Sequence, residues 1–188
     1  MAKPVVDRAD LLPQLAEVFR AHGYEGATLA LIGQATGLGK GSLYHFFPGG
    51  KAQMAAEVLA GIDHWFEVNI FAPLRESDDP ARAVAAMVGA VDSYFRSGHR
   101  MCLVGVIALG ASRDTFAGQV QDYFRRWNDA LALVLRRSGL SASVARRRST
   151  DALITIQGAL VLARASDDSR MFGQAMADMT RRLLARPD

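Results

Sequence analysis

The spacing of apolar side chains predicts helices along almost the whole chain. Apolar residues recur every three or four positions, the period that places them on one face of an α-helix, in segments that begin near residues 10, 28, 40, 51, 80, 101, 116, 141 and 169. Alternation of apolar and polar residues, which would indicate a strand, is absent, and so is any repeat of roughly 20 to 50 residues. The pattern predicts an all-α fold of about nine helices.

Capping residues mark the ends of the first two predicted helices. Asp10 is the expected N-cap of the first helix, Pro13 falls in its first turn, and Gly23 supplies a left-handed stop. The second helix, TLALIGQAT, begins at Thr28 and ends at Gly37. Glycine suits this end because it takes a positive φ without a Cβ clash.

A break in the pattern near residue 50 predicts two regions. A third short helix is expected over residues 40–46, with Leu43 and Phe46 facing inward, before PGGK interrupts the pattern. A long helix then begins near Lys51. We therefore expect a head of residues 1–50 and a larger helical region of residues 51–188.

Three later segments are distinguished by their apolar faces. Residues 101–110 are apolar all round and are expected to be buried on every side. Ser141 is the expected N-cap of the helix of about residues 141–165. This helix and the helix of about residues 169–186 carry wide apolar faces, which suit a four-helix interface between two copies of the chain. Packing within one chain is the alternative for these two helices.

Composition limits the class of protein without defining it. The chain has 188 residues, half of them hydrophobic, and one cysteine, Cys102, so no internal disulfide is possible. The absence of a signal peptide and of an apolar run of about 20 residues predicts a cytoplasmic protein. The net charge is only +3, and 17 arginines lie beyond Lys51. Any case for DNA binding must therefore rest on where particular residues lie.

The stretch GLGKGSLYHFF, residues 37–47, has three possible interpretations. A nucleotide-binding loop is disfavoured, because the P-loop pattern would need glycine where Gln34 stands and Ser or Thr where Gly41 stands, and no strand precedes it. A helix-turn-helix is favoured by a glycine turn between two short helices. A glycine-rich turn between purely structural helices is the third interpretation.

The longer stretch favours the second interpretation. FRAHGYEGATL (19–29), IGQATGLG (32–39) and KGSLYHF (40–46) together resemble the N-terminal domain of the tetracycline-repressor-like (TetR) family. The resemblance covers about residues 8–66, with the motif at about 28–47, and FPGGK is similar to a subset of that family. It implies a homodimeric repressor that binds double-stranded DNA at a palindromic operator and is released by a small, largely apolar effector.

The resemblance also implies roles for individual residues. Thr28, Tyr44 and Lys51 would contact phosphates, and Lys40, Gly41, Ser42 and His45 would face the DNA groove. Two positions depart from the family pattern. Gly39 replaces the usual Ser or Thr before the third helix, and Gly33 stands at a usually small position, where it would loosen the second helix.

The remaining residues would form the ligand-binding and dimerisation domain, with the dimer made through the last two helices. Met and aromatic side chains suit an adaptable apolar pocket, although plain core packing is the alternative for each of them. The candidates are Trp65, Phe66, Met87, Tyr94, Phe95, Cys102, Tyr123, Phe124 and Trp127. Polar residues such as Asn128 and Gln157 could orient a ligand.

The helix from Lys51 to Phe66 links the expected phosphate contact with the expected pocket, so a ligand that tilts it would alter operator binding.

An enzyme is not expected, because the four histidines show no catalytic or metal-ligand spacing. No cofactor or metal is expected. A helical interaction module that has lost DNA binding is the alternative function.

Overall fold

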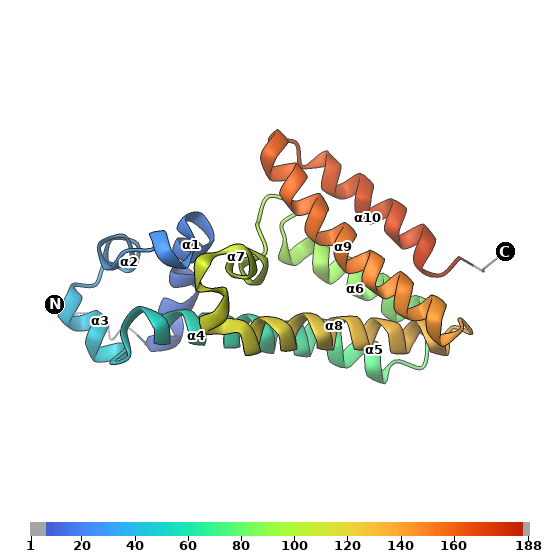
Figure 1. The fold of residues 1–188 in the computed structure, drawn as a ribbon, viewed down its shortest axis with the longest axis horizontal. Helices are drawn as coiled ribbons and strands as arrows, with labels where there is room; N and C mark the ends of the chain where they lie inside the picture. Colours follow the sequence, from blue (N-terminus) through green and yellow to red (C-terminus); the bar gives the residue numbers. More distant parts are fainter. Residues whose placement is uncertain (1–6, 186–188) are drawn as a thin grey trace. The chain divides into compact units, whose positions relative to one another are not determined.

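The computed structural model describes residues 7–185, and every regular element within this range is helical. The elements are α1 (Arg8–Gly26), α2 (Leu29–Thr36), α3 (Lys40–Phe46), α4 (Gly50–Phe66), η1 (Glu67–Phe71), α5 (Ala72–Glu76), α6 (Pro80–Tyr94), α7 (Leu103–Leu109), η2 (Ala111–Phe116), α8 (Ala117–Arg137), α9 (Ala142–Ser166) and α10 (Arg170–Leu183) (Figure 1). The segments α4, η1 and α5 follow one another without a break, and so do η2 and α8. Counting each run as one gives nine helices among the described residues, which confirms the predicted all-α fold of about nine helices. None of the helices described is long and apolar enough to cross a membrane.

The chain divides into two compact units by its backbone contacts. The first contains the residues up to Asp63 together with Leu103–Val120, and the second contains His64–Cys102 together with the residues from Gln121 onward. The boundary within α4 therefore lies between Asp63 and His64. The division into residues 1–50 and 51–188 remains a prediction about functional regions.

The first helix begins and ends for local reasons. Its N-cap is Asp7, whose side chain accepts a hydrogen bond from the N–H of Ala9 at 3.1 Å, so the prediction that Asp10 caps this helix was wrong. Pro13 accordingly lies inside the helix instead of in its first turn. At Gly23 the backbone leaves helical geometry, with φ 66° and ψ 177°, so a glycine break lies at this residue as predicted. It is a kink and not the predicted left-handed stop, because its ψ is far from the left-handed helical value and the helix resumes as far as Gly26.

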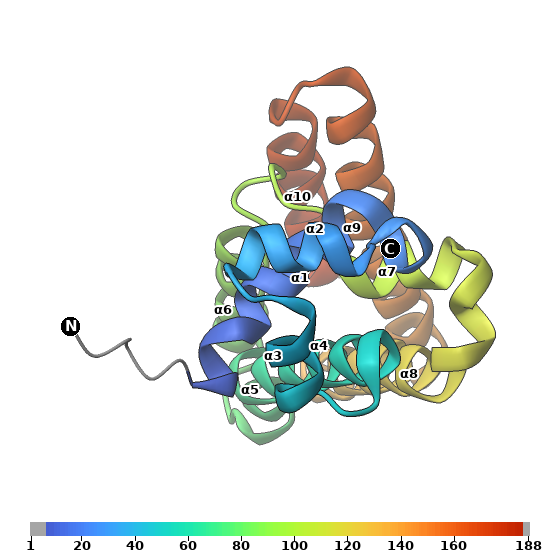
Figure 2. The ribbon, with the colours of Figure 1, turned by 90° about the vertical axis from the view of Figure 1, so that its left-hand side faces the viewer.

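The helices α2 and α3 meet across a tight turn. Thr28 caps α2 by accepting a hydrogen bond from the N–H of Leu31, and Gly37 ends it in the left-handed conformation, with φ 68° and ψ 12°. Gly33 has a role that the sequence did not reveal. A Cβ at this position would lie 2.8 Å from the carbonyl oxygen of Leu38, so glycine lets the turn close onto α2. Figure 2 shows α1, α2 and α3 together.

The inward face of α3 differs in one residue from the prediction. Leu43 is fully buried as expected, but Phe46 is only half-buried, and the next residue, Phe47, is fully buried. Phe47 lies just beyond the helix as its C-cap, so helical periodicity does not govern the direction of its side chain.

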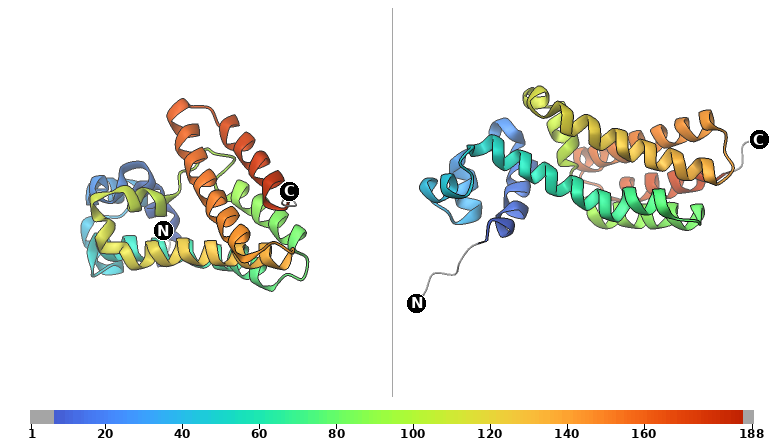
Figure 3. Two further views of the ribbon diagram at one scale, coloured as in Figure 1. Left: turned by 45° about the vertical axis from the view of Figure 1, so that its right-hand side comes forward. Right: turned by 90° about the horizontal axis from the view of Figure 1, so that it is seen from below.

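In the second unit, α9 and α10 form an antiparallel pair (Figures 1 and 3). Ser141 caps α9 through the N–H of Val144, as predicted for this helix. The final helix, α10, ends at Leu183, while the predicted end at residue 186 lies outside the described residues.

One burial prediction was wrong. In the segment 101–110, Leu103, Val104 and Ile107 are buried, but Leu109 is 85% exposed at the end of α7. Leu109 is the last residue of α7 and lies off the face formed by Leu103, Val104 and Ile107, so its apolar chemistry does not decide its exposure.

Candidate nucleic-acid interface and aromatic cluster

The third helix presents one polar face and one buried anchor. The side chains of Lys40, Ser42, Tyr44 and His45 are exposed, as is Gly41, while Leu43 is fully buried. The structure therefore brings five of the predicted DNA-binding residues onto one short helix. A Cβ at Gly41 would meet no atom within 4 Å, so the chain leaves open space at this point of the helix.

Thr28 lies at the start of α2 and is exposed. Its Oγ1 accepts the hydrogen bond from Leu31 N–H at 3.2 Å, which leaves the hydroxyl proton able to donate to a phosphate oxygen. The free N–H groups of a helix start favour an anion at this position.

Gly39 is the N-cap of α3, and no side chain caps this helix. Its φ of −74° and ψ of 162° are open to any residue. The departure from the family pattern therefore removes a hydroxyl and gains no special backbone conformation.

Lys51 has an intramolecular role that the sequence did not show. Its Nζ donates to the carbonyl oxygens of Tyr24 at 2.8 Å and Glu25 at 3.3 Å, and it lies 4.5 Å from the centre of the Tyr24 ring. These contacts tie the first turn of α4 to the end of α1. An ammonium group carries three donors, so one N–H remains for a phosphate.

Glu25 links the end of α1 to η2 within the first unit. Its Oε1 accepts a hydrogen bond from the N–H of Ser112 at 2.5 Å. The pKa of the Glu25 carboxyl lies below its usual value, because its own backbone N–H and Ser112 donate hydrogen bonds to it and Lys51 is close by. No pattern in the sequence connected Glu25 with Ser112, which lies 87 residues away.

The second unit contains a cluster of aromatic side chains centred on Phe66. Ring centres of Tyr94, Tyr123 and Trp127 lie 4.8, 5.0 and 5.2 Å from that of Phe66. The aromatic cluster comprises Trp65, Phe66, Phe71, Tyr94, Phe95, Tyr123, Phe124, Trp127 and Phe172. Seven of these are predicted pocket residues. The remaining two predicted pocket residues, Met87 and Cys102, are buried in the same unit.

Phe71 is a member of the aromatic cluster that helical periodicity missed. The chain forms a π-helical turn at η1, where the N–H of Ala72 bonds to the carbonyl of Glu67. Because a π turn brings residues five apart onto one face, Phe71 follows Phe66 with ring centres 5.9 Å apart. Ile70, the neighbour at the ordinary helical spacing from Phe66, is fully buried as well.

Two polar groups near the aromatic cluster differ in their partners. The side chain of Trp127 is fully buried, and its Nε1 has no hydrogen-bond partner among residues 7–185. Asn128, a predicted ligand-orienting residue, donates to Oγ1 of Thr150 at 3.2 Å and accepts from Ser149. Asn128 therefore joins α8 to α9, while Trp127 retains an unused donor.

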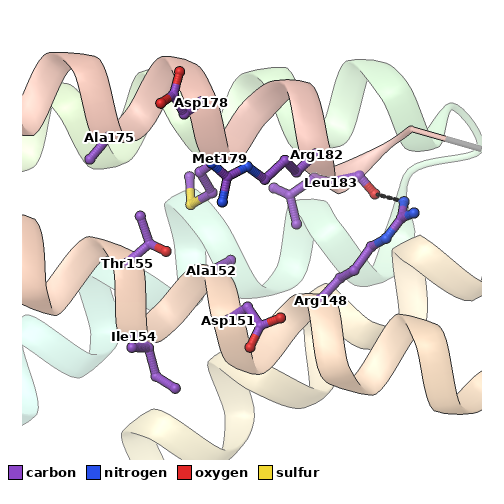
Figure 4. A pocket seen from close by; sticks show the side chains of 10 residues that line it. All are labelled: Arg148, Asp151, Ala152, Ile154, Thr155, Ala175, Asp178, Met179, Arg182 and Leu183. Carbon is purple, nitrogen blue, oxygen red and sulfur yellow. Dashed lines mark hydrogen bonds between the residues drawn. The ribbon is translucent and has the colours of Figure 1, made fainter.

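A surface hollow of about 460 Å³ lies along α9 and α10 (Figure 4). Met179 of α10 and Thr155 of α9 face each other across it, and Arg148 reaches past it to donate to the carbonyl oxygen of Leu183 at 3.0 Å. Ile154 points away from α10 and is 65% exposed. The hollow lies on the two helices predicted to form the dimer.

A three-helix head in which a glycine turn joins the second helix to a polar third helix defines a helix-turn-helix protein. Two family models match the chain. The model of bacterial regulatory proteins of the tetR family matches residues 11–58, and the model of the LmrA/YxaF-like transcriptional regulator C-terminal domain matches residues 80–178. The chain belongs to the TetR family of transcriptional regulators, which confirms the resemblance.

Individual relatives agree with this membership. The HTH-type transcriptional regulator LmrA of Bacillus subtilis is 27% identical over 166 residues, which cover 86% of this chain and 88% of LmrA. A TetR family regulator from Agrobacterium tumefaciens has a TM-score of 0.77 at 25% identity, over 95% of this chain and 100% of that one. A cysteine mutant of the TetR family regulator CifR, complexed with 26bp double-strand operator DNA, matches with a TM-score of 0.76 at 23% identity, over 99% of this chain and 100% of that one.

Proposed function

We propose that this regulator is a homodimeric repressor that binds a palindromic operator through α3 and is released by a small, largely apolar effector. The observation that carries the proposal is the polar face of α3, where Lys40, Ser42, Tyr44 and His45 are exposed around the buried Leu43. One such helix reads only a few base pairs, so two copies are needed to recognise a palindrome. Such a protein would act in the cytoplasm, where bacterial DNA lies.

Within this proposal, the residues have separate tasks. Tyr44, Thr28 and the third donor of Lys51 hold phosphates and set the register, while Lys40 and His45 reach base edges. Gly41 offers no side chain, so the backbone of α3 can approach the groove closely at that point.

The test is a gel-shift titration on the DNA that flanks the gene of this protein. Wild-type protein is expected to retard a specific fragment, less strongly as salt rises, because binding releases counterions from the phosphates. Tyr44→Ala is expected to abolish this retardation, and Gln121→Ala, at an exposed glutamine of α8, serves as the matched control. Absence of any specific retardation across the salt range would support the interaction-module alternative.

The effector would bind in the aromatic cluster. Its nine aromatic side chains suit an apolar ring system, and the unused Nε1–H of Trp127 provides one directed donor for an acceptor group on the ligand. Binding there can weaken operator binding through α4, which is continuous from Lys51 to Phe66. The loss of DNA affinity is limited by the ratio of the ligand's affinities for the DNA-free and the DNA-binding conformations.

Release of the operator complex by candidate effectors tests this second part. A ligand that binds the wild-type protein should weaken its operator complex, and Trp127→Phe should reduce the affinity for acceptor-bearing ligands while keeping the ring volume largely filled. An effector that binds in the aromatic cluster and leaves DNA affinity unchanged would contradict the proposed switch.

A further inference from the structure

The turn between α3 and α4 is held from inside α4. Pro48 and Gly49 form the centre of a β-turn, closed by a hydrogen bond of 2.8 Å from the N–H of Gly50 to the carbonyl of Phe47. The side chain of Gln53 reaches back to this turn, where its Oε1 accepts a hydrogen bond of 2.7 Å from the N–H of Gly49. Without that acceptor, the Gly49 N–H has no other protein partner among the hydrogen bonds that the structure shows for the described residues.

Gln53 is itself held in place by Glu57 of α4, which in turn pairs with Arg8 of α1. Its Nε2 donates to Oε1 of Glu57 at 2.9 Å, and Glu57 forms an ion pair with Arg8. The guanidinium of Arg8 lies 4.9 Å from the centre of the Phe47 ring. These contacts form a network that runs from Arg8 at the start of α1, through Glu57 and Gln53, to the turn that follows α3.

The Gly49–Gly50 turn lies beside the side chain of Tyr44. Gly50 is buried and has a φ of +64°, and a Cβ on it would lie 3.4 Å from Cε1 and 3.9 Å from the hydroxyl oxygen of Tyr44. The backbone of Gly50 thus lies against the Tyr44 ring, one side of which is free, since the residue is 42% exposed. The turn therefore bounds one side of the Tyr44 ring.

We propose that Gln53 is a positioning residue for DNA binding, which fixes the Gly49–Gly50 turn and thereby orients the Tyr44 hydroxyl toward a phosphate. The inference rests on the proposed role of Tyr44 in holding the operator. Gly49 and Gly50 are glycines, which have wider backbone freedom than other residues, so the hydrogen bond from Gln53 helps to select one conformation of the turn. If this bond is lost, Tyr44 must be ordered at the moment of binding, which weakens the complex.

A double-mutant cycle on operator affinity tests this inference. The four proteins are wild type, Tyr44→Phe, Gln53→Ala and the double variant, with affinity measured by fluorescence anisotropy at one salt concentration. Tyr44→Phe and Gln53→Ala are each expected to weaken binding about threefold to tenfold, as for one lost hydrogen bond. In the Tyr44→Phe background, Gln53→Ala is expected to cause no further loss, because it acts through the missing hydroxyl.

A second substitution of Gln53 and a control complete the experiment. Gln53→Leu, which keeps most of the side-chain volume but has no acceptor for the Gly49 N–H, is expected to weaken binding as Gln53→Ala does, and wild-type affinity of this variant would overturn the inference. Gln121→Ala is expected to match wild type. The midpoint of thermal unfolding is recorded for each protein, so that loss of fold is distinguished from loss of orientation.

The outcomes separate this inference from the proposed function. If Gln53→Ala weakens binding equally in both backgrounds, Gln53 stabilises the head without acting on Tyr44, and the inference is overturned while operator binding stands. An unchanged affinity of Gln53→Ala also overturns it. If wild type binds no operator, or Tyr44→Phe binds as wild type does, the inference fails together with the proposed role of Tyr44.

Discussion

At the residue scale, the glycines of the head differ in what a methyl group would meet. A Cβ at Gly33 would lie 2.8 Å from the carbonyl oxygen of Leu38, whereas one at Gly41 would meet nothing within 4 Å. The first contact is with backbone, which cannot rotate away. Packing therefore requires glycine at residue 33, whereas at residue 41 a larger side chain would contact no other part of the protein.

This difference gives a first prediction. Gly33→Ala is expected to lower the free energy of unfolding by about 1–3 kcal/mol, because α2 and the turn must move apart. Gly41→Ala, its matched control, is expected to raise it by up to about 1 kcal/mol, the gain in helix propensity. Urea denaturation measures both, and equal effects of the two substitutions would contradict the contact at Leu38.

Gly39 gives a second prediction. Because its φ and ψ suit serine, Gly39→Ser should add the missing side-chain cap to α3 and raise the free energy of unfolding by a few tenths of a kcal/mol. The hydroxyl also adds a phosphate contact, so operator affinity should rise about threefold to tenfold. Gly39→Ala is the control, since it changes the backbone in the same way without a hydroxyl, and an affinity gain equal to that of serine would argue against a phosphate contact.

The third prediction concerns pH. The pKa of Glu25 is lowered in the folded protein, so its ionised form contributes stability that is present above the unfolded pKa and is lost as pH falls through the folded pKa. Wild type should therefore lose stability on acidification below the usual range of a glutamate, and Glu25→Gln should lose less over the same range. Unfolding midpoints measured from neutral to acidic pH would reveal this, and parallel curves for the two proteins would refute it.

At the element scale, α8 and α9 are joined by polar side chains as well as by apolar packing. Ser149 is fully buried on α9 and donates to Oδ1 of Asn128 on α8, and Asn128 donates onward to Thr150. A buried hydroxyl without a partner is unfavourable, so this network fixes how α9 lies on α8.

A fourth prediction follows for this helix pair. Asn128→Ala should lower the free energy of unfolding by about 1–3 kcal/mol, because it removes the side-chain bonds between α8 and α9 and leaves the Ser149 hydroxyl only its bond to the carbonyl oxygen of Arg146 on its own helix. Ser149→Ala should cost less in the Asn128→Ala background than in wild type, since the bond between the two side chains is then already lost. Chemical denaturation of the four proteins measures this, and strictly additive losses would show that the network does not couple the helices.

The elements also show where sequence reasoning succeeded and where it failed. Thr28, Gly37 and Ser141 were recognised as helix ends because capping depends on residues a few positions apart. Phe71 was missed because a π turn replaces the 3.6-residue period after Phe66. The exposure of Leu109 was missed because burial depends on what packs against a helix, which periodicity does not contain.

At the scale of the whole molecule, one surface of α9 indicates how two copies would meet. Ile154, Val161 and Leu162 are 65%, 47% and 53% exposed, and Gly158 lies between them on the same face. An apolar stripe with a glycine at its centre suits close approach of a second helix, as a two-fold interface requires. The dimer through the last two helices remains our proposal.

The fifth prediction tests that dimer. Leu162→Glu should place two charges in the interface and shift the protein from dimer to monomer, with loss of operator binding, because one head alone makes half of the contacts. Gln121→Glu, an exposed change on α8 outside the last two helices, should leave the dimer intact. Sedimentation velocity distinguishes the two, and a Leu162→Glu protein that stays dimeric would place the interface elsewhere.

The sequence by itself determined the helical class, the glycine turn of the head and the identity of the exposed residues on α3, because all three depend on neighbours within a few positions. Only the tertiary structure decided the partners of Lys51, the need for glycine at residue 33 and the network that joins Arg8, Glu57 and Gln53 to the turn beside Tyr44. These contacts join residues up to 49 positions apart, and pairing at that separation is set by how the helices pack, not by any local pattern.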